Sequence, residues 1–253
     1  MKKILANLAF GAILVSSLNA DIIRAEIGAG IWSQTPSGNA YYNGSVSGLR
    51  GNDTLQENKN TSSYVWAFVK HPVPVLPNLR LEYVNINANG KASGEWSGLG
   101  IPSGLNSDST VNMKQYDIIP YYNILDNTFW ITLDVGLDAK IIYLDYEIAQ
   151  KGIFSGYKYK SVIQIPLGYL RTRVQIPTTG LAVESDIKYI KYAGSIIYDA
   201  RAKIDYTFDI SPLIQPALEI GYRAQKIKID DSSTSIKTDI NFRGPYLGLF
   251  LRF

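Results

Sequence analysis

Residues 129–148 alternate between apolar and polar positions for more than a dozen residues, and this pattern constrains the fold more than any other feature of the chain. One parity is apolar and comprises Ile131, Leu133, Val135, Leu137, Ala139, Ile141 and Tyr143. The other parity is mostly charged or small and comprises Thr132, Asp134, Gly136, Asp138, Lys140 and Ile142. Because successive side chains of a strand point to opposite faces, the segment predicts an amphipathic β-strand. Strands are usually about 5–6 residues long, so this one is unusually long.

The same alternation recurs along the rest of the chain. Tyr64, Trp66 and Phe68 alternate with Val65, Ala67 and Val69. Further apolar faces are formed by Ile23 to Ile31, Leu79 to Tyr83, Tyr116 to Tyr122, Ile163, Ile165, Leu167 and Tyr169, Leu181 to Tyr189, Tyr198 to Phe208, Leu218 to Tyr222, and Leu247 to Phe253, each taken at every second position. We therefore expect a barrel of about ten strands, with any number from 8 to 12 possible. An even number returns both termini to one side.

The connections between these segments fall into two classes. Residues 72–78, 123–127, 172–180 and 209–214 are short and contain Pro, Asn or Gly, which form turns. Residues 33–62 and 88–110 are long and rich in Gly, Ser and Asn. Short turns on one rim and longer loops on the other are typical of the periplasmic and extracellular ends of outer-membrane barrels.

The first twenty residues differ from the remainder. Lys2 and Lys3 form a basic start, residues 4–18 are mostly apolar and uncharged, and Ala20 is a small residue at the end. This layout predicts a secretory signal peptide over residues 1–20, cleaved after Ala20, and a single barrel domain over residues 21–253. The alternative is a membrane anchor, but the apolar run is short for a span of about 20 residues.

The composition excludes several classes of protein. The chain has no cysteine, as suits an oxidising compartment. Its formal charge of +3 includes the two lysines of the leader, and no basic block suggests a nucleic-acid partner. No segment after the leader has the 18 or so uninterrupted apolar residues of a transmembrane helix. The mean hydropathy of −0.04 fits a transmembrane barrel, in which only alternate residues meet lipid.

Alternation alone does not decide which face is outside, since a soluble ligand-carrying barrel would turn its apolar face inward. Aromatic residues favour the membrane because they gather at strand ends, as in the girdles of membrane barrels. The expected girdle residues are Trp32, Tyr83, Tyr122, Trp130, Tyr143, Tyr169, Tyr189, Tyr198 and Phe208. The predicted fold class is therefore all-β, a transmembrane antiparallel up-and-down β-barrel.

Three segments carry a resemblance to known proteins. Leu247, Leu249, Leu251 and Phe253 resemble the C-terminal signal by which the barrel-assembly machinery recognises outer-membrane proteins. Residues 24–32 and 71–78 resemble an uncharacterised family of small proteobacterial outer-membrane β-barrels. The resemblance implies export by a Sec-type pathway to the outer membrane of a Gram-negative bacterium, with Phe253 as the assembly signal. It brings no catalytic residues.

If the apolar face meets lipid, the polar parity lines the lumen with charges of both signs. These are Arg24, Glu26, Arg80, Glu82, Asp117, Asp134, Asp138, Lys140, Glu184, Asp186, Lys188, Arg201, Lys203, Asp205, Glu219 and Arg223. An unpaired buried charge costs several kcal/mol, so we expect a salt-bridged lumen charge network. About eight strands leave an interior just filled by side chains, whereas wide pores need about 16. The network either stabilises the fold alone or lines a narrow solute path.

Catalytic chemistry has little support in the sequence. Barrel hydrolases generally use a histidine near the outer rim, but the single histidine, His71, lies among prolines in an expected periplasmic turn. Asp134 and Asp138 could act as an acid–base pair, although ion pairing suits them better. No cysteine or histidine cluster forms a metal site, and no cofactor is expected. Gly28 and Gly30 lie within a strand, where they would relieve crowding.

The segment 88–110 holds Trp96, Leu99 and Ile101 among glycines. These residues could cover the barrel mouth, bind an apolar ligand or pack only against one another. Since loops carry function on rigid scaffolds, this segment is a candidate binding region.

Three functions follow in order of preference. The first is a narrow, porin-like channel for small solutes, the second a structural or surface-interaction barrel without transport, and the third a membrane-embedded hydrolase. We therefore expect no enzymatic activity, and we expect outer-membrane lipid, the barrel-assembly machinery and small solutes as partners.

Overall fold

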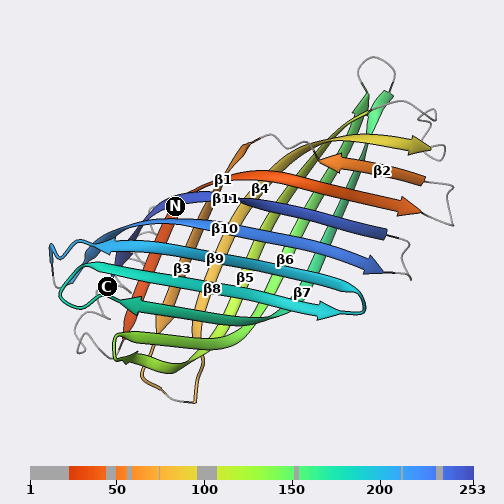
Figure 1. Ribbon diagram of the computed structural model, residues 1–253. Helices are drawn as coiled ribbons and strands as arrows, with labels where there is room; N and C mark the ends of the chain where they lie inside the picture. The colour runs from red at the N-terminus through yellow and green to blue at the C-terminus, as the bar shows by residue number, and fades with distance from the viewer. Residues whose placement is uncertain are drawn as a thin grey trace, which may run out of the picture.

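The computed structural model describes residues 23–43, 50–55, 59–73, 75–95, 107–150, 154–211, 213–231 and 236–253, and Figure 1 shows strands curving around a single ring. The predicted leader, residues 1–20, and the loop residues Trp96, Leu99 and Ile101 lie outside these ranges. Within them, no helix is long and apolar enough to span a membrane.

Eleven strands run along the described part of the chain. Their bounds are β1 Arg24–Asn43, β2 Arg50–Leu55, β3 Asn60–Lys70, β4 Asn78–Glu95, β5 Ser107–Thr128, β6 Ile131–Gln150, β7 Phe154–Gln175, β8 Leu181–Tyr192, β9 Ser195–Thr207, β10 Gln215–Asp231 and β11 Ile236–Arg252. The longest, β5 and β7, have 22 residues each. At about 3.3 Å per residue, such strands extend well beyond a hydrocarbon core of about 30 Å.

Ten of these strands close the ring. From β3 to β11 each strand pairs antiparallel with the next one, and β1 joins β3 on one side and β11 on the other. The closing pair aligns Ile27 with Leu251, so the start of β1 and the end of β11 lie at the same rim, called here the termini rim. The predicted all-β, antiparallel barrel of ten strands is confirmed.

The strand β2 is not one of these ten strands. It pairs with the end of β1 and with the end of β4, beyond the point at which β3 begins (Figure 1). The predicted loops over residues 33–62 and 88–110 are therefore largely wrong, because β1 continues to Asn43 and β4 to Glu95. Beyond the membrane the outer face of a strand meets water: in β4 Asn87 and Asn89 point outward, whereas Ile86 and Ala88 are buried inside. The pairing therefore continues there without an apolar outer face.

The two faces of the ring differ in chemistry as the alternation predicts. Ile27, Leu137 and Leu249 point outward and are 53%, 67% and 65% exposed, whereas Asp134 and Lys188 point inward and are fully buried. A continuous apolar exterior of this extent is unfavourable in water and favourable in hydrocarbon. The ring is therefore built for a bilayer, with its charges inside.

Two aromatic predictions are wrong. Trp32 and Tyr169 were expected in the lipid-facing girdle, but they point into the lumen with exposed fractions of 0% and 3%. Trp32 shares the inward parity of Glu26, and its indole N–H donates to the carbonyl of Gly244 at 3.1 Å. The other seven predicted girdle residues lie on the outer face: Tyr83, Tyr122, Trp130, Tyr143, Tyr189, Tyr198 and Phe208.

The whole apolar parity of β7 was assigned to the wrong face. Ile163, Ile165, Leu167 and Tyr169 point inward, and Val162 and Leu170 point outward. The reason is that β7 continues to Gln175 and carries Arg171 and Arg173 in the parity of Tyr169. Two arginines on the lipid face would be costly, so this parity must face the lumen.

Two turns also differ from the prediction. The hairpin between β5 and β6 turns at Phe129 and Trp130, both with positive φ, and the ladder is irregular between Asn123 and Thr128. The turn expected at residues 123–127 therefore lies further along the chain. The turn after β7 begins only after Gln175, whereas the connections 72–78 and 209–214 agree with the prediction.

The outward orientation of Leu137 gives a direct test of the barrel's orientation. Leu137 is central in the apolar run of β6, so we expect Leu137→Arg to destabilise the folded barrel by about 2–4 kcal/mol. Asn112→Arg, on the outer face of β5 beyond the apolar zone, should cost about 0–1 kcal/mol. Urea unfolding in lipid vesicles measures both. Equal costs for the two variants would mean that the exterior does not face hydrocarbon.

Candidate functional site in the barrel interior

The lumen charge network is centred on Lys188 of β8. Its ammonium group lies 2.5 Å from Glu82 of β4 and 2.6 Å from Asp117 of β5, and all three side chains are buried. These strands belong to different walls of the ring. The two contacts therefore cross the lumen and tie one wall to the other.

Glu82 is shared by three cations. In addition to Lys188, it accepts hydrogen bonds from Arg80 and Arg201, each at 2.5 Å. Arg201 also clasps both carboxylate oxygens of Asp186 at 2.9–3.1 Å. Charge-assisted hydrogen bonds of this kind are about twice as strong as neutral ones. The bond between Arg201 and Glu82 therefore links β9 to β4 across the lumen.

A second branch begins at Lys140 of β6. Its ammonium group lies 2.6 Å from Asp117 and 3.3 Å from Asp199 of β9. Arg223 of β10 grips Asp199 with two hydrogen bonds of 2.9 and 2.5 Å. The network thus runs without interruption from β5 through β6 and β9 to β10.

A third group lies nearer the termini rim. Arg171 binds Asp134 and Glu184, each at 2.6 Å. Arg173 binds Glu184 at 3.2 Å and forms a two-bond pair with Asp205. Both arginines and all three carboxylates are buried. At the rim itself, Glu26 pairs with Arg24 and with Arg252.

Aromatic side chains fill the space between the charges. Tyr64 and Trp66 donate hydrogen bonds to Glu219 at 2.7 and 3.2 Å, and Lys203 lies 2.8 Å from the same carboxylate. Arg80 and Lys203 lie over the ring of Trp66 at 4.9 and 5.0 Å from its centroid. The lumen therefore combines cation–π contacts with ion pairs.

A glycine on β1 makes room for this aromatic layer. Gly28 pairs with Trp66 across the β1–β3 ladder. A Cβ atom on Gly28 would lie 2.6 Å from Trp66 Cε2 and 2.9 Å from Phe250 Cβ. Such contacts are too short, which agrees with the prediction that a glycine here relieves crowding in the lumen.

Toward the opposite rim the lumen becomes apolar. Gln115 of β5 and Gln225 of β10 exchange hydrogen bonds of 2.7 and 3.3 Å across the barrel. Beyond them lies one buried cluster that includes Ile86, Ile142, Ile197, Ile227 and Phe242. The interior is thus closed twice, first by ion pairs and then by packed apolar side chains.

The structure brings fifteen of the sixteen predicted network residues into ion pairs. They are Arg24, Glu26, Arg80, Glu82, Asp117, Asp134, Lys140, Glu184, Asp186, Lys188, Arg201, Lys203, Asp205, Glu219 and Arg223. Asp138 is the exception, since neither of its buried carboxylate oxygens has a hydrogen-bond partner among the described residues.

Four charged residues of the network were not assigned to it from the sequence. They are Arg171, Arg173, Asp199 and Arg252. Asp199 lies between Tyr198 and Ala200, and Arg252 lies between Leu251 and Phe253, so alternation with the apolar face would have placed both in the lumen. Arg171 shares the parity of Tyr169, which was expected to face lipid, and Arg173 lies in the turn expected from residue 172.

The remaining predicted positions lie at the termini rim. His71 follows β3, where its ring nitrogen Nε2 is 3.1 Å from the carbonyl of Pro77. Phe253 donates its backbone N–H to Ala25 at 2.9 Å, which places it beside the start of β1. Among the described residues, no group of three or more His, Cys, Asp or Glu side chains is arranged to hold a metal ion.

Comparisons with known proteins agree on the architecture. No protein-family model matches the chain, and no curated protein does. The outer membrane protease OmpT from Escherichia coli has a similar structure, with a TM-score of 0.55 at 9% identity, covering 93% of this chain and 98% of OmpT. The fold is therefore that of bacterial outer-membrane β-barrels.

Two transport proteins are also similar but more distant. The translocator domain of autotransporter NalP from Neisseria meningitidis has a TM-score of 0.45 and 12% identity, covering 98% of this chain and 96% of that domain. The transport unit of autotransporter AIDA-I from Escherichia coli has a TM-score of 0.40 and 11% identity, covering 96% of each chain.

The contacts of Lys188 predict a large effect of its removal. We expect Lys188→Met to lower the free energy of unfolding by about 3–5 kcal/mol, because Glu82 and Asp117 would lose a buried cation. Lys191→Met, on the exposed end of the same strand, should change it by no more than about 0.5 kcal/mol. Urea titration in detergent, followed by circular dichroism, measures both. If Lys188→Met lowered the free energy of unfolding by less than about 1 kcal/mol, the ion pairs around Lys188 would be hydrated and only weakly coupled.

Proposed function

We propose that the protein is an outer-membrane barrel with a closed lumen, which acts as a membrane-anchored scaffold and not as an open pore. The observation that supports this most is the set of ion pairs across the lumen, with Lys188 bound to Glu82 and Asp117. The apolar cluster around Ile142 and Phe242 closes the passage a second time. An ion or solute would have to break both barriers to pass.

This proposal favours the structural or surface-interaction barrel over the narrow channel for small solutes. A solute path needs polar side chains whose hydrogen bonds can be exchanged with the solute. Here most of the lumen charges already have partners within the protein, and breaking such a buried pair costs about 3–5 kcal/mol. Transport would therefore require a large rearrangement of the interior.

The proposed location is the outer membrane of a Gram-negative bacterium, reached by Sec-type export. An apolar exterior with tyrosines near its edges supports this location. Phe253, beside the start of β1, would then be recognised by the barrel-assembly machinery before the ring closes. The working surface would be the rim opposite the termini, which faces the cell exterior in this orientation.

The absence of enzymatic activity is part of the proposal. The chain has a single histidine. His71 lies at the termini rim with its ring directed to the carbonyl of Pro77. Asp134 is engaged by Arg171 at 2.6 Å, which suits an ion pair better than a general base. A hydrolase at the opposite rim would have to work without a histidine.

Bilayer conductance separates the two leading functions. We expect no steady conductance from the purified barrel in planar bilayers at neutral pH, because the lumen is closed at two levels. The same preparation must show a band on a gel whose mobility changes on heating, as a folded barrel does. An absence of conductance then reflects a closed lumen and not an unfolded protein. Steady, ion-selective openings from that folded protein would favour the channel and refute the scaffold.

A further inference from the structure

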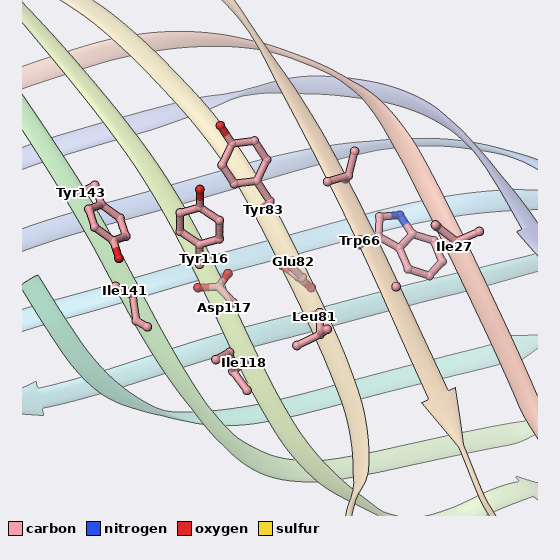
Figure 2. A pocket seen from close by; sticks show the side chains of 12 residues that line it. Ile27, Trp66, Leu81, Glu82, Tyr83, Tyr116, Asp117, Ile118, Ile141 and Tyr143 are labelled. Carbon is pink, nitrogen blue, oxygen red and sulfur yellow. The ribbon is translucent and has the colours of Figure 1, made fainter. Parts of the chain in front are cut away.

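The outer wall of the barrel is hollowed over β3 to β6. A shallow apolar groove of about 550 Å³ lies on this lipid-facing surface. Figure 2 shows its lining residues, which come from β1, β3, β4, β5 and β6. We call this surface the tyrosine groove, and it is formed by Leu81, Tyr83, Tyr116, Ile118, Ile141 and Tyr143.

The three tyrosines form one row across the groove. The ring centroids of Tyr83 and Tyr116 are 4.9 Å apart, and those of Tyr116 and Tyr143 are 5.7 Å apart. In Figure 2 the hydroxyl groups of Tyr83 and Tyr116 point away from Leu81 and Ile118, whereas the hydroxyl group of Tyr143 points toward Ile141. Tyr83 and Tyr116 therefore mark the boundary between an apolar floor and a polar edge, as aromatic residues do at the headgroup level of a membrane.

A second hollow continues from this row toward the opposite rim. It has a volume of about 790 Å³ and shares Tyr116 and Tyr143 with the tyrosine groove. Its lining mixes apolar side chains such as Val162 with polar ones, among them Asn112, Lys114, Asp145 and Lys160. The two hollows together form one amphipathic surface, apolar below the tyrosines and cationic above them.

The cations of the upper hollow are available to a ligand. Lys114 is exposed, and within the described chain it has no ion-pair partner. Lys160 lies 3.3 Å from Asp145, but its side chain is 75% exposed. An ion pair this exposed is weak, so an anion could compete for Lys160.

We propose that this surface binds lipopolysaccharide, with acyl chains along the tyrosine groove and a headgroup phosphate at Lys114 and Lys160. The inference rests on the proposed function, because it requires the rim opposite the termini to face the outer leaflet. A basic site beside an apolar groove at the membrane surface suits a phosphorylated lipid. The amides of Asn85 and Asn112 add hydrogen-bond partners for the sugar hydroxyls.

The wall formed by β8 to β10 offers a matched control. Lys191 and Lys228 both pair with Ile196, so they flank one position on neighbouring strands. Tyr189 and Tyr198 lie below them as a directly paired couple. Replacing these two lysines removes the same charge from the same rim but leaves the tyrosine groove intact.

The experiment measures binding of bisphosphorylated lipid A to the full-length folded barrel in detergent, by native mass spectrometry. We expect Lys114→Ala/Lys160→Ala to weaken binding roughly 30-fold, from about 1 kcal/mol for each lysine near a charged lipid surface. Lys191→Ala/Lys228→Ala should weaken it less than about threefold, because those lysines lie on another wall. Dephosphorylated lipid A should bind the unchanged protein about as weakly as the double variant binds lipid A.

Three outcomes would overturn the inference. Equal losses for the two double variants would mean that binding depends on net charge alone. Equal binding of the dephosphorylated lipid would exclude a phosphate contact, and equal binding of phosphatidylglycerol would exclude selectivity for the saccharolipid. A separate flotation assay with vesicles distinguishes the two proposals. Failure to float refutes the membrane barrel, whereas flotation without selective binding refutes only this lipid site.

Discussion

The ion pairs across the lumen are the interaction on which the rest of the structure depends. A ring that faces hydrocarbon must turn its ionic side chains inward, where little water can solvate them. Lys188 is fully buried and has two carboxylates within 2.6 Å, and Glu82 has three cations around it. The contacts of Lys188 and Arg201 join β8 and β9 to β4 and β5, so the network fixes the shape of the ring. A half-satisfied network would be worse than an apolar interior.

The interior is divided along the barrel axis into two zones of different chemistry. The ionic zone lies toward the termini rim, and the apolar zone around Ile142 and Phe242 lies toward the opposite rim. The paired amides of Gln115 and Gln225 lie between them. Buried charges need specific partners, whereas apolar side chains pack with little directional preference. The ionic zone therefore specifies the arrangement, and the apolar zone excludes water.

The sequence predicts the strand number and most of the face assignments because lipid imposes a period of two on every spanning strand. It fails at Trp32 and Tyr169, since an aromatic ring suits a crowded lumen as well as a girdle. It also fails beyond the membrane, where β1 and β4 continue without an apolar outer face because that face meets water. The ion-pair partners could not be predicted, because they depend on the stagger between strands that are distant in sequence.

Ring closure has a consequence for biosynthesis. The pairing of β1 with β11 joins the start of the barrel to its last residues, and Arg252 brings the counter-charge that Glu26 needs. Until the final residues have been made, β1 presents a free edge, and Glu26 has Arg24 but not Arg252 as a counter-charge. A nascent or truncated polypeptide therefore has no closed ring, and its unpaired strand edge is open to pairing with other chains until the last strand forms.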